Sequence, residues 1–133
     1  MKNQIKKFLL LFTLTILAFS CSSDDNDNNN PPSGSRKIKY EITGNYVGPL
    51  TVIYTAQSGA QTYLEVTSLP WSLEFVMSDS AYSSQLTING GTASQVGKSI
   101  TAKIFQGDVQ KREGTATGDS RGFFTLSLPS IVF

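Results

Sequence analysis

Residues 37–44 read KIKYEITG, and this short stretch decides the fold class. Ile38, Tyr40 and Ile42 alternate with charged or polar neighbours, which is the two-residue period of a β-strand with one buried face. An amphipathic helix would instead repeat its apolar residues every three or four positions. We therefore expect a strand that begins near residue 37 and ends in a turn at Gly44.

The same period returns along the rest of the chain. Alternating segments occupy residues 50–54, 62–66, 71–75, 86–88, 100–104, 109–113 and 124–128. Turn-forming residues separate them at 44–49, at Asn89-Gly90-Gly91, at 106–108 and in a loop over 114–122. Pro70 indicates that the segment starting at Trp71 is an edge strand or begins at a bulge. Seven to eight short strands in this pattern predict an all-β, antiparallel β-sandwich.

The first 20 residues have the pattern of a secretory signal. Three lysines within residues 2–7 precede an apolar run over residues 8–19. Cys21 is the only cysteine of the 133-residue chain, and residues 18–21, AFSC, resemble the lipobox of bacterial lipoproteins. That resemblance implies cleavage before Cys21 and a diacylglycerol, with palmitate-type acyl chains, on its sulfur. An uncleaved signal anchor is the alternative, although a span needs about 20 apolar residues.

Residues 21–36 comprise Cys21 and a tether rich in Asp, Asn, Ser and Pro. We expect this tether to be disordered, because it cannot bury enough apolar surface to offset chain entropy. Its acidic run, DDND at 24–27, resembles the surface-export signal of lipoproteins in the Bacteroidota. A solubilising spacer is the alternative. The folded domain is expected over residues 37–133, held at the outer membrane or cell surface and facing either the periplasm or the exterior.

Composition excludes several classes of function. Basic and acidic residues are equal in number over residues 37–133, so no nucleic-acid partner is expected. The lipid on Cys21 is then the source of membrane affinity. The chain has no histidine and its folded domain no cysteine, which removes most metal, thiol and imidazole chemistry. Acidic residues fall on polar strand faces or in turns, and no G-x-S-x-G motif occurs. We expect no enzyme activity, metal or cofactor.

Several strings, in order, resemble the extracytoplasmic domain of the MmpS family, small membrane-anchored proteins that accompany RND-type MmpL lipid exporters. They are KYEITG at 39–44, LTVIY at 50–54, SLPWS at 68–72, ITAKI at 100–104 and the Gly107-Asp108 turn. The resemblance covers residues 38–128 and implies an immunoglobulin-like β-sandwich. It also implies a transport-accessory or assembly protein whose partner is an RND-type transporter or its lipid cargo. We interpret the chain as a non-enzymatic cell-envelope lipoprotein of this kind.

Two features depart from the family. Its mycobacterial members are usually held by an uncleaved N-terminal helix, whereas this chain has a lipobox. Many members carry two cysteines on late strands, and the corresponding stretches around Ala102 and Ser127 have none. We expect the fold to tolerate both changes. The anchoring helix could contribute to the contact with a transporter, so its replacement by a lipobox concerns the partnership and not the fold.

The aromatic residues supply the candidate binding surface. Tyr46, Tyr63 and Tyr82 fall in loops or on the polar register of strands, and tyrosine combines a large contact area with a polar tip. If they gather at one end of the domain, the protein is instead a surface-exposed glycan- or protein-binding module. Other aromatics are expected in the core, with Trp71 at its centre. These are Tyr40, Tyr54, Trp71, Phe75 and Phe124. The sequence leaves the oligomeric state open.

Overall fold

The computed structural model describes residues 34–133. The expected signal, Cys21 and most of the expected tether lie outside these residues. The described part is mainly strand and contains one short 3-10 helix, η1 (Ala93–Gln95). The strands are β1 (Lys37–Gly44), β2 (Leu50–Thr55), β3 (Gln61–Val66), β4 (Trp71–Val76), β5 (Ser83–Gly91), β6 (Ser99–Gln106), β7 (Val109–Thr117) and β8 (Phe123–Val132).

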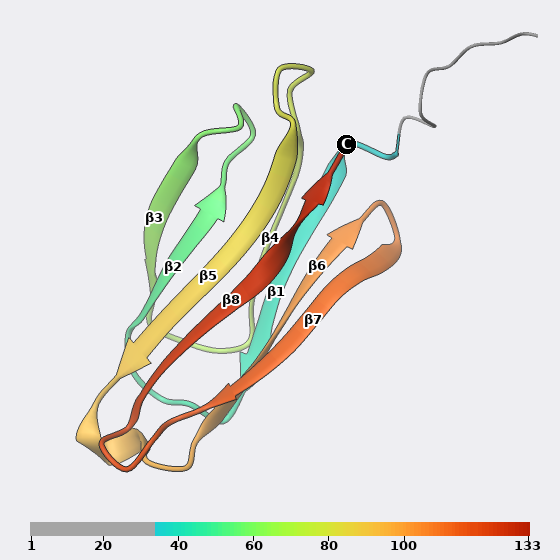
Figure 1. Ribbon diagram of the computed structural model, residues 1–133. Coiled ribbons are helices and arrows are strands. Elements are labelled where there is room, and N and C mark those ends of the chain that lie inside the picture. The colour runs from blue at the N-terminus through green and yellow to red at the C-terminus, as the bar shows by residue number, and fades with distance from the viewer. Residues whose placement is uncertain (1–33) are drawn as a thin grey trace, which may run out of the picture. The chain divides into compact units, whose positions relative to one another are not determined.

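These strands form two antiparallel sheets that pack face to face (Figure 1). The strand order is β4-β1-β6-β7 in the first sheet and β3-β2-β5-β8 in the second. The predicted antiparallel β-sandwich of seven to eight strands is confirmed, with eight strands. Trp71 begins β4 directly after Pro70, and β4 is an edge strand, as the proline indicated.

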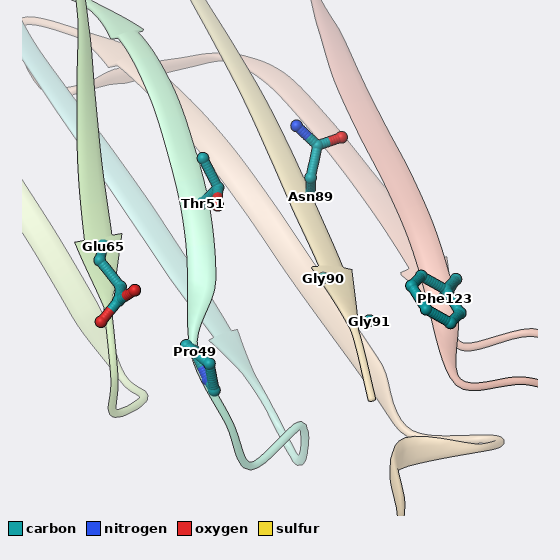
Figure 2. A pocket seen from close by; sticks show the side chains of 7 residues that line it. All are labelled: Pro49, Thr51, Glu65, Asn89, Gly90, Gly91 and Phe123. Carbon is teal, nitrogen blue, oxygen red and sulfur yellow. The ribbon is translucent and has the colours of Figure 1, made fainter. Parts of the chain in front are cut away.

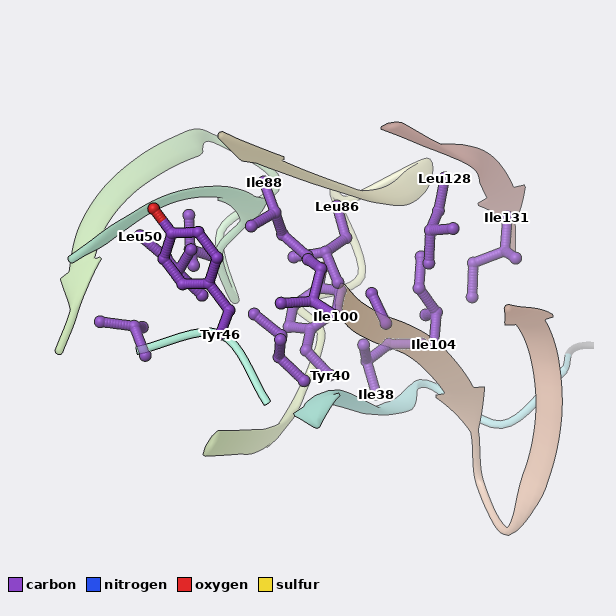
Figure 3. Packing of buried hydrophobic residues seen from close by; sticks show 14 of the residues in the cluster. Ile38, Tyr40, Tyr46, Leu50, Leu86, Ile88, Ile100, Ile104, Leu128 and Ile131 are labelled. Carbon is purple, nitrogen blue, oxygen red and sulfur yellow. The ribbon is translucent and has the colours of Figure 1, made fainter. Parts of the chain in front are cut away.

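The hydrophobic core lies between the two sheets (Figure 3). On β1, Ile38, Tyr40 and Ile42 are fully buried, and on β6 Ile100 and Ile104 are as well. The second sheet contributes Leu50, Val52, Leu86, Ile88 and Leu128. Because apolar and polar residues alternate along the strands, the apolar face of each sheet lies in the core. Each large aliphatic side chain buried in this way stabilises the fold by about 1.5–3 kcal/mol.

Tyr40, and not Trp71, is the central aromatic residue. Tyr40 is fully buried, and its hydroxyl lies 2.8 Å from the carbonyl oxygen of Thr55 and 2.5 Å from Oγ of Ser84. Burial raises the pKa of this phenol above its ordinary value. Trp71 is only partly buried because β4 has no neighbour on its outer side. The prediction that Trp71 occupies the centre of the core is therefore wrong.

The predicted turn at Asn89-Gly90-Gly91 is also wrong, because these residues end β5 and pair with both neighbouring strands. Glycine serves here to provide space. A Cβ atom on Gly90 would overlap the ring of Phe124, and one on Gly91 would overlap the ring of Phe123. The two aromatic rings of β8 take the room that the glycines leave.

The predicted loop over residues 114–122 is shorter in the structure, because residues 114–117 continue β7. The remaining turn is held by Asp119. One carboxylate oxygen of Asp119 accepts backbone hydrogen bonds from Phe123 at 3.0 Å and Arg121 at 2.8 Å. These bonds lower the pKa of the Asp119 carboxyl. Asp119 thus lies in a turn, as the sequence predicted, and its carboxylate caps the backbone there.

The start of β1 and the C-terminus lie at the same end of the domain (Figure 1). Arg36 directs its guanidinium at the carbonyl oxygens of the β4–β5 loop, at 3.4 Å from Met77 and 2.8 Å from Ala81, and it also bonds to Ser78. The same guanidinium lies 5.0 Å from the ring centroid of Phe133. The chain therefore enters the domain at a point fixed by Arg36.

Candidate functional site

The two long sides of the sandwich differ in how the sheets meet. On one side β7 and β8 pack against each other, as they lie in Figure 1. The inward residues of β7 include Gly114 and Ala116, which pair with the core residues of β6. A Cβ atom on Gly114 would lie 2.7 Å from Leu128 Cδ2 and 3.0 Å from Leu126 Cδ1. Small residues on β7 therefore allow the sheets to close along this side.

On the opposite side, β3 and β4 make no comparable approach. Trp71, Leu73 and Phe75 form the inward row of β4, in register with the buried row of β1, yet all three are only partly buried. Leu64 on β3 is 38% exposed although it pairs with buried Val52. Large side chains thus line this side of the sandwich and stay partly exposed. We call Leu64, Trp71, Leu73 and Phe75 the open side.

An aromatic cluster supports the open side from within. The ring of Tyr40 meets the rings of Tyr54 and Phe75 edge to face, at centroid distances of 5.6 Å and 5.9 Å. Tyr54 and Phe75 lie 6.4 Å apart. Such pairs contribute about 0.5–1.5 kcal/mol beyond the burial of their area. The cluster ties β4 to β2 across the sandwich and fixes the position of Phe75.

The backbone along the open side is also unpaired. In the described sheets β3 pairs only with β2, and β4 pairs only with β1. Natural edge strands are commonly protected by lysine, proline or a bulge. Neither the sequence of β3, QTYLEV, nor that of β4, WSLEFV, has a lysine or a proline, and their registers are regular. Both edges are therefore suited to pairing with an added strand.

The three tyrosines predicted as a binding surface are not brought together. Tyr46 lies in the β1–β2 turn at one end of the domain, and Tyr82 lies between β4 and β5 at the other end. Tyr63 is on β3. Tyr63 and Tyr82 are 70% and 85% exposed, whereas Tyr46 is only 3% exposed. The surface that combines all three residues is therefore not formed.

Tyr46 does not present its ring on the exposed surface. Its ring packs edge to face on Phe124, at 5.3 Å, and fills the end of the sandwich. Its hydroxyl is buried and has no hydrogen-bond partner within residues 34–133. A hollow of about 220 Å³ adjoins this turn. Its lining consists of Gly44, Asn45, Tyr46, Val47, Thr67, Ser68 and Leu69. Ligand pockets usually measure about 300–1,000 Å³, so this one is small.

The carboxylates do not form a catalytic pair or a metal centre in the part of the chain that the structure describes. Glu41 lies 3.3 Å from Lys39, and Glu74 lies 3.1 Å from Lys37, on outer strand faces. Exposed pairs of this kind contribute about 0–1 kcal/mol. Residues 34–133 contain no group of three His, Cys, Asp or Glu side chains placed to hold a metal ion. Within the same residues, no helix has the length and apolar character needed to cross a bilayer.

Sequence reasoning missed the open side because it depends on strand order. The alternating pattern indicated that Leu64 and Leu73 face the core, and both do point inward. Nothing in that pattern says which strands lie at the edges of the sheets. The small residues at positions 114 and 116 were the available signal, since they indicate where the sheets approach closely. The predicted lipid site, Cys21, lies outside the described residues and stays a prediction.

The chain matches one known protein family. A family model described as Mycobacterium membrane protein matches residues 13–124, which include all of β1 to β7 and the start of β8. The match also includes part of the N-terminal segment that precedes the described domain. A search of curated proteins found no match.

Proposed function

The chain belongs to the Mycobacterium membrane protein family, which is the MmpS-like family, and we propose that it is a lipid-anchored accessory subunit of an RND-type envelope transporter. The family is one of membrane-associated accessory proteins. The β-sandwich agrees with the fold that the resemblance implied. The proposed role is non-enzymatic, and the domain acts by binding.

Anchoring is proposed to come from a lipid on Cys21. The apolar run before this residue and the polar segment after it support this part of the proposal. Arg36 fixes the point where the chain enters the domain, at the end that holds the β4–β5 loop and the C-terminus. The anchored end of the domain is therefore the Arg36 end, at the outer membrane or cell surface.

Docking is proposed to use the open side. The observation that supports this role is the partly exposed apolar row of β4 beside unpaired strand edges. Partly buried Trp71, Leu73 and Phe75 lie beside two unpaired strand edges. An extended segment of a transporter could add to β3 through main-chain hydrogen bonds and place apolar side chains against the open side. A partner of this kind accounts for apolar surface that the sandwich itself leaves uncovered.

The alternative role, a glycan- or protein-binding module built on Tyr46, Tyr63 and Tyr82, has weaker support. Tyr46 is buried, and the other two tyrosines lie on different elements. We therefore retain the transport-accessory role as the proposed function.

Affinity purification from solubilised envelope tests the proposal. The full chain carries a tag, and Leu64→Lys is compared with Val109→Lys, which makes the same change at a site that is 57% exposed on β7. We expect an RND-type transporter to be recovered with the wild type and with Val109→Lys. Leu64→Lys should reduce recovery at least about tenfold, because a charge at a buried contact opposes docking. Absence of a transporter, or equal recovery with both variants, would contradict the proposal.

A further inference from the structure

A second hollow, of about 290 Å³, lies on the outer face of the sheet β3-β2-β5-β8 (Figure 2). Its lining consists of Pro49, Thr51, Glu65, Asn89, Gly90, Gly91 and Phe123. Thr51 pairs with both Glu65 and Asn89, so these three side chains form one row across three strands. The row lies on the face opposite the core. The hollow is a shallow depression, and its volume, near the lower limit of about 300 Å³ for ligand pockets, leaves room for one ring-sized group at most.

Phe123 forms the apolar wall of this hollow. Its ring lies across Gly91, at the position that a Cβ atom would occupy, and the residue is 53% exposed. The guanidinium of Arg121 lies 5.7 Å from the ring centroid. Contact with Gly91 and Arg121 holds the ring in place while part of its surface stays open. Figure 2 shows Phe123 at one side of the hollow and Glu65 at the other.

The polar side of the hollow offers both acceptors and donors. Oδ1 of Asn89 accepts a hydrogen bond from Oγ1 of Thr125 at 2.8 Å. This bond orients the amide and leaves its Nδ2 group to donate elsewhere. The carboxylate of Glu65 takes part in none of the ion pairs within residues 34–133. Thr51 lies between them and is exposed.

This combination favours a neutral, hydroxyl-rich ring over other ligands. A sugar hydroxyl can donate to a carboxylate, and such charge-assisted hydrogen bonds are short and strong. A sugar oxygen can accept from the amide of Asn89, while an apolar ring face lies against Phe123. A phosphate would meet the negative charge of Glu65, and the Arg121 guanidinium beside Phe123 is already paired with Asp119 at 3.2 Å. An acyl chain would leave the row of polar groups without partners, which costs about 1–3 kcal/mol for each buried group.

We propose that this hollow binds one neutral sugar ring, carried either by a soluble saccharide or by a glycolipid headgroup. Glu65 accepts from ring hydroxyls, Asn89 donates to a ring oxygen, and Phe123 contacts the apolar face. The site lies on the outer face of the sheet, whereas the open side faces the other sheet, although β3 contributes Glu65 to the first and Leu64 to the second.

Chemical shifts of the backbone amides test the proposal on the full chain in zwitterionic detergent micelles. Detergents with sugar headgroups are avoided because they would compete for the site. One arm adds soluble neutral oligosaccharides, and a second arm adds a neutral glycolipid to the micelles. A third arm adds a sialylated oligosaccharide as the anionic comparison. Glu65→Gln is the test variant, and Glu74→Gln, a partly exposed carboxylate on the other sheet, is the matched control.

We expect shifts at Thr51, Asn89, Gly90 and Gly91 in at least one neutral arm. Glu65→Gln should weaken that binding about tenfold and Glu74→Gln should leave it unchanged, because only Glu65 lines the hollow. Binding in the glycolipid arm alone supports the headgroup as the source, and binding in the oligosaccharide arm supports soluble saccharide. No shift in either neutral arm, preference for the sialylated ligand, or indifference to Glu65→Gln with an unchanged melting temperature would overturn the proposal.

Discussion

At the scale of single residues, Tyr40 joins the core to the candidate docking site. Within residues 34–133 it is the largest fully buried side chain, and it contacts both Tyr54 and Phe75. Its hydroxyl is satisfied by Thr55 and Ser84 from the opposite sheet. This one residue therefore links the two sheets by packing and by hydrogen bonds, and it supports Phe75 at the open side.

Tyr40→Phe should lower the free energy of unfolding by about 1–3 kcal/mol, because it leaves the Thr55 carbonyl and the Ser84 hydroxyl without a buried partner. Urea unfolding measures the change. Tyr63→Phe is the control, since Tyr63 is exposed, and it should change stability by less than about 0.5 kcal/mol. A Tyr40→Phe protein as stable as the control would contradict the assigned role of the hydroxyl.

The same substitution should change how the free energy of unfolding depends on pH in the alkaline range. The pKa of Tyr40 is raised in the folded state, so above about pH 10 the unfolded chain loses this proton first. The contribution is fully present below that pH and is lost as pH rises toward the folded pKa. Stability should fall as the pH rises above about 10 toward the folded pKa of Tyr40, and Tyr40→Phe should reduce that fall. An identical fall in both proteins would contradict the raised pKa.

At this scale the sequence predicted the buried row of β1 correctly, because alternation alone identifies which side chains share a face. It failed at Tyr46 and Trp71. Tyr46 lies in a turn yet folds back over the end of the core, and Trp71 lies in an alternating row yet stays partly exposed at an edge. Both depend on which elements become neighbours, and local pattern does not contain that information.

At the scale of elements, the sandwich is closed along β7 and β8 and open along β3 and β4. Gly114 and Ala116 remove bulk where the sheets approach, whereas Trp71 and Phe75 place bulk at the other side. Glycine was interpreted as a turn signal at Gly90 and at Gly114. In both places it lies inside a strand, because a neighbouring side chain needs the space that a Cβ atom would fill.

Gly114→Val should destabilise the domain by about 1–3 kcal/mol, because the added side chain must displace Leu126 and Leu128 from a packed contact. Thr115→Val, on the exposed face of the same strand, is the matched control. Thermal unfolding of both variants measures the difference. If Gly114→Val proves as stable as Thr115→Val, then β7 and β8 do not close the sandwich through this glycine.

At the scale of the whole molecule, the proposed protein is a domain with one open side, carried on a proposed N-terminal anchor. Family membership supports a membrane-associated accessory protein, and attachment through the N-terminal segment remains part of the proposal. The fold class was predictable from periodicity and from the resemblance. The position of the docking surface was not, since it follows from the strand order β3-β2-β5-β8 and β4-β1-β6-β7.

Cys21→Ala should produce an unlipidated protein that no longer partitions with membranes, because the proposal assigns the attachment to acyl chains on Cys21. Fractionation followed by mass spectrometry of the intact chain measures both properties. Persistent membrane association of the variant at its unprocessed mass would instead indicate an uncleaved N-terminal helix.

Photo-crosslinking in intact cells tests most directly whether the open side docks to a transporter. A photoreactive phenylalanine derivative replaces Leu64 on the open side, and in a second protein it replaces Lys111, which is exposed on β7. We expect a covalent adduct with an RND-type transporter from position 64 and little from position 111. Equal adducts from both positions, or no transporter among the adducts from position 64, would contradict docking through the open side.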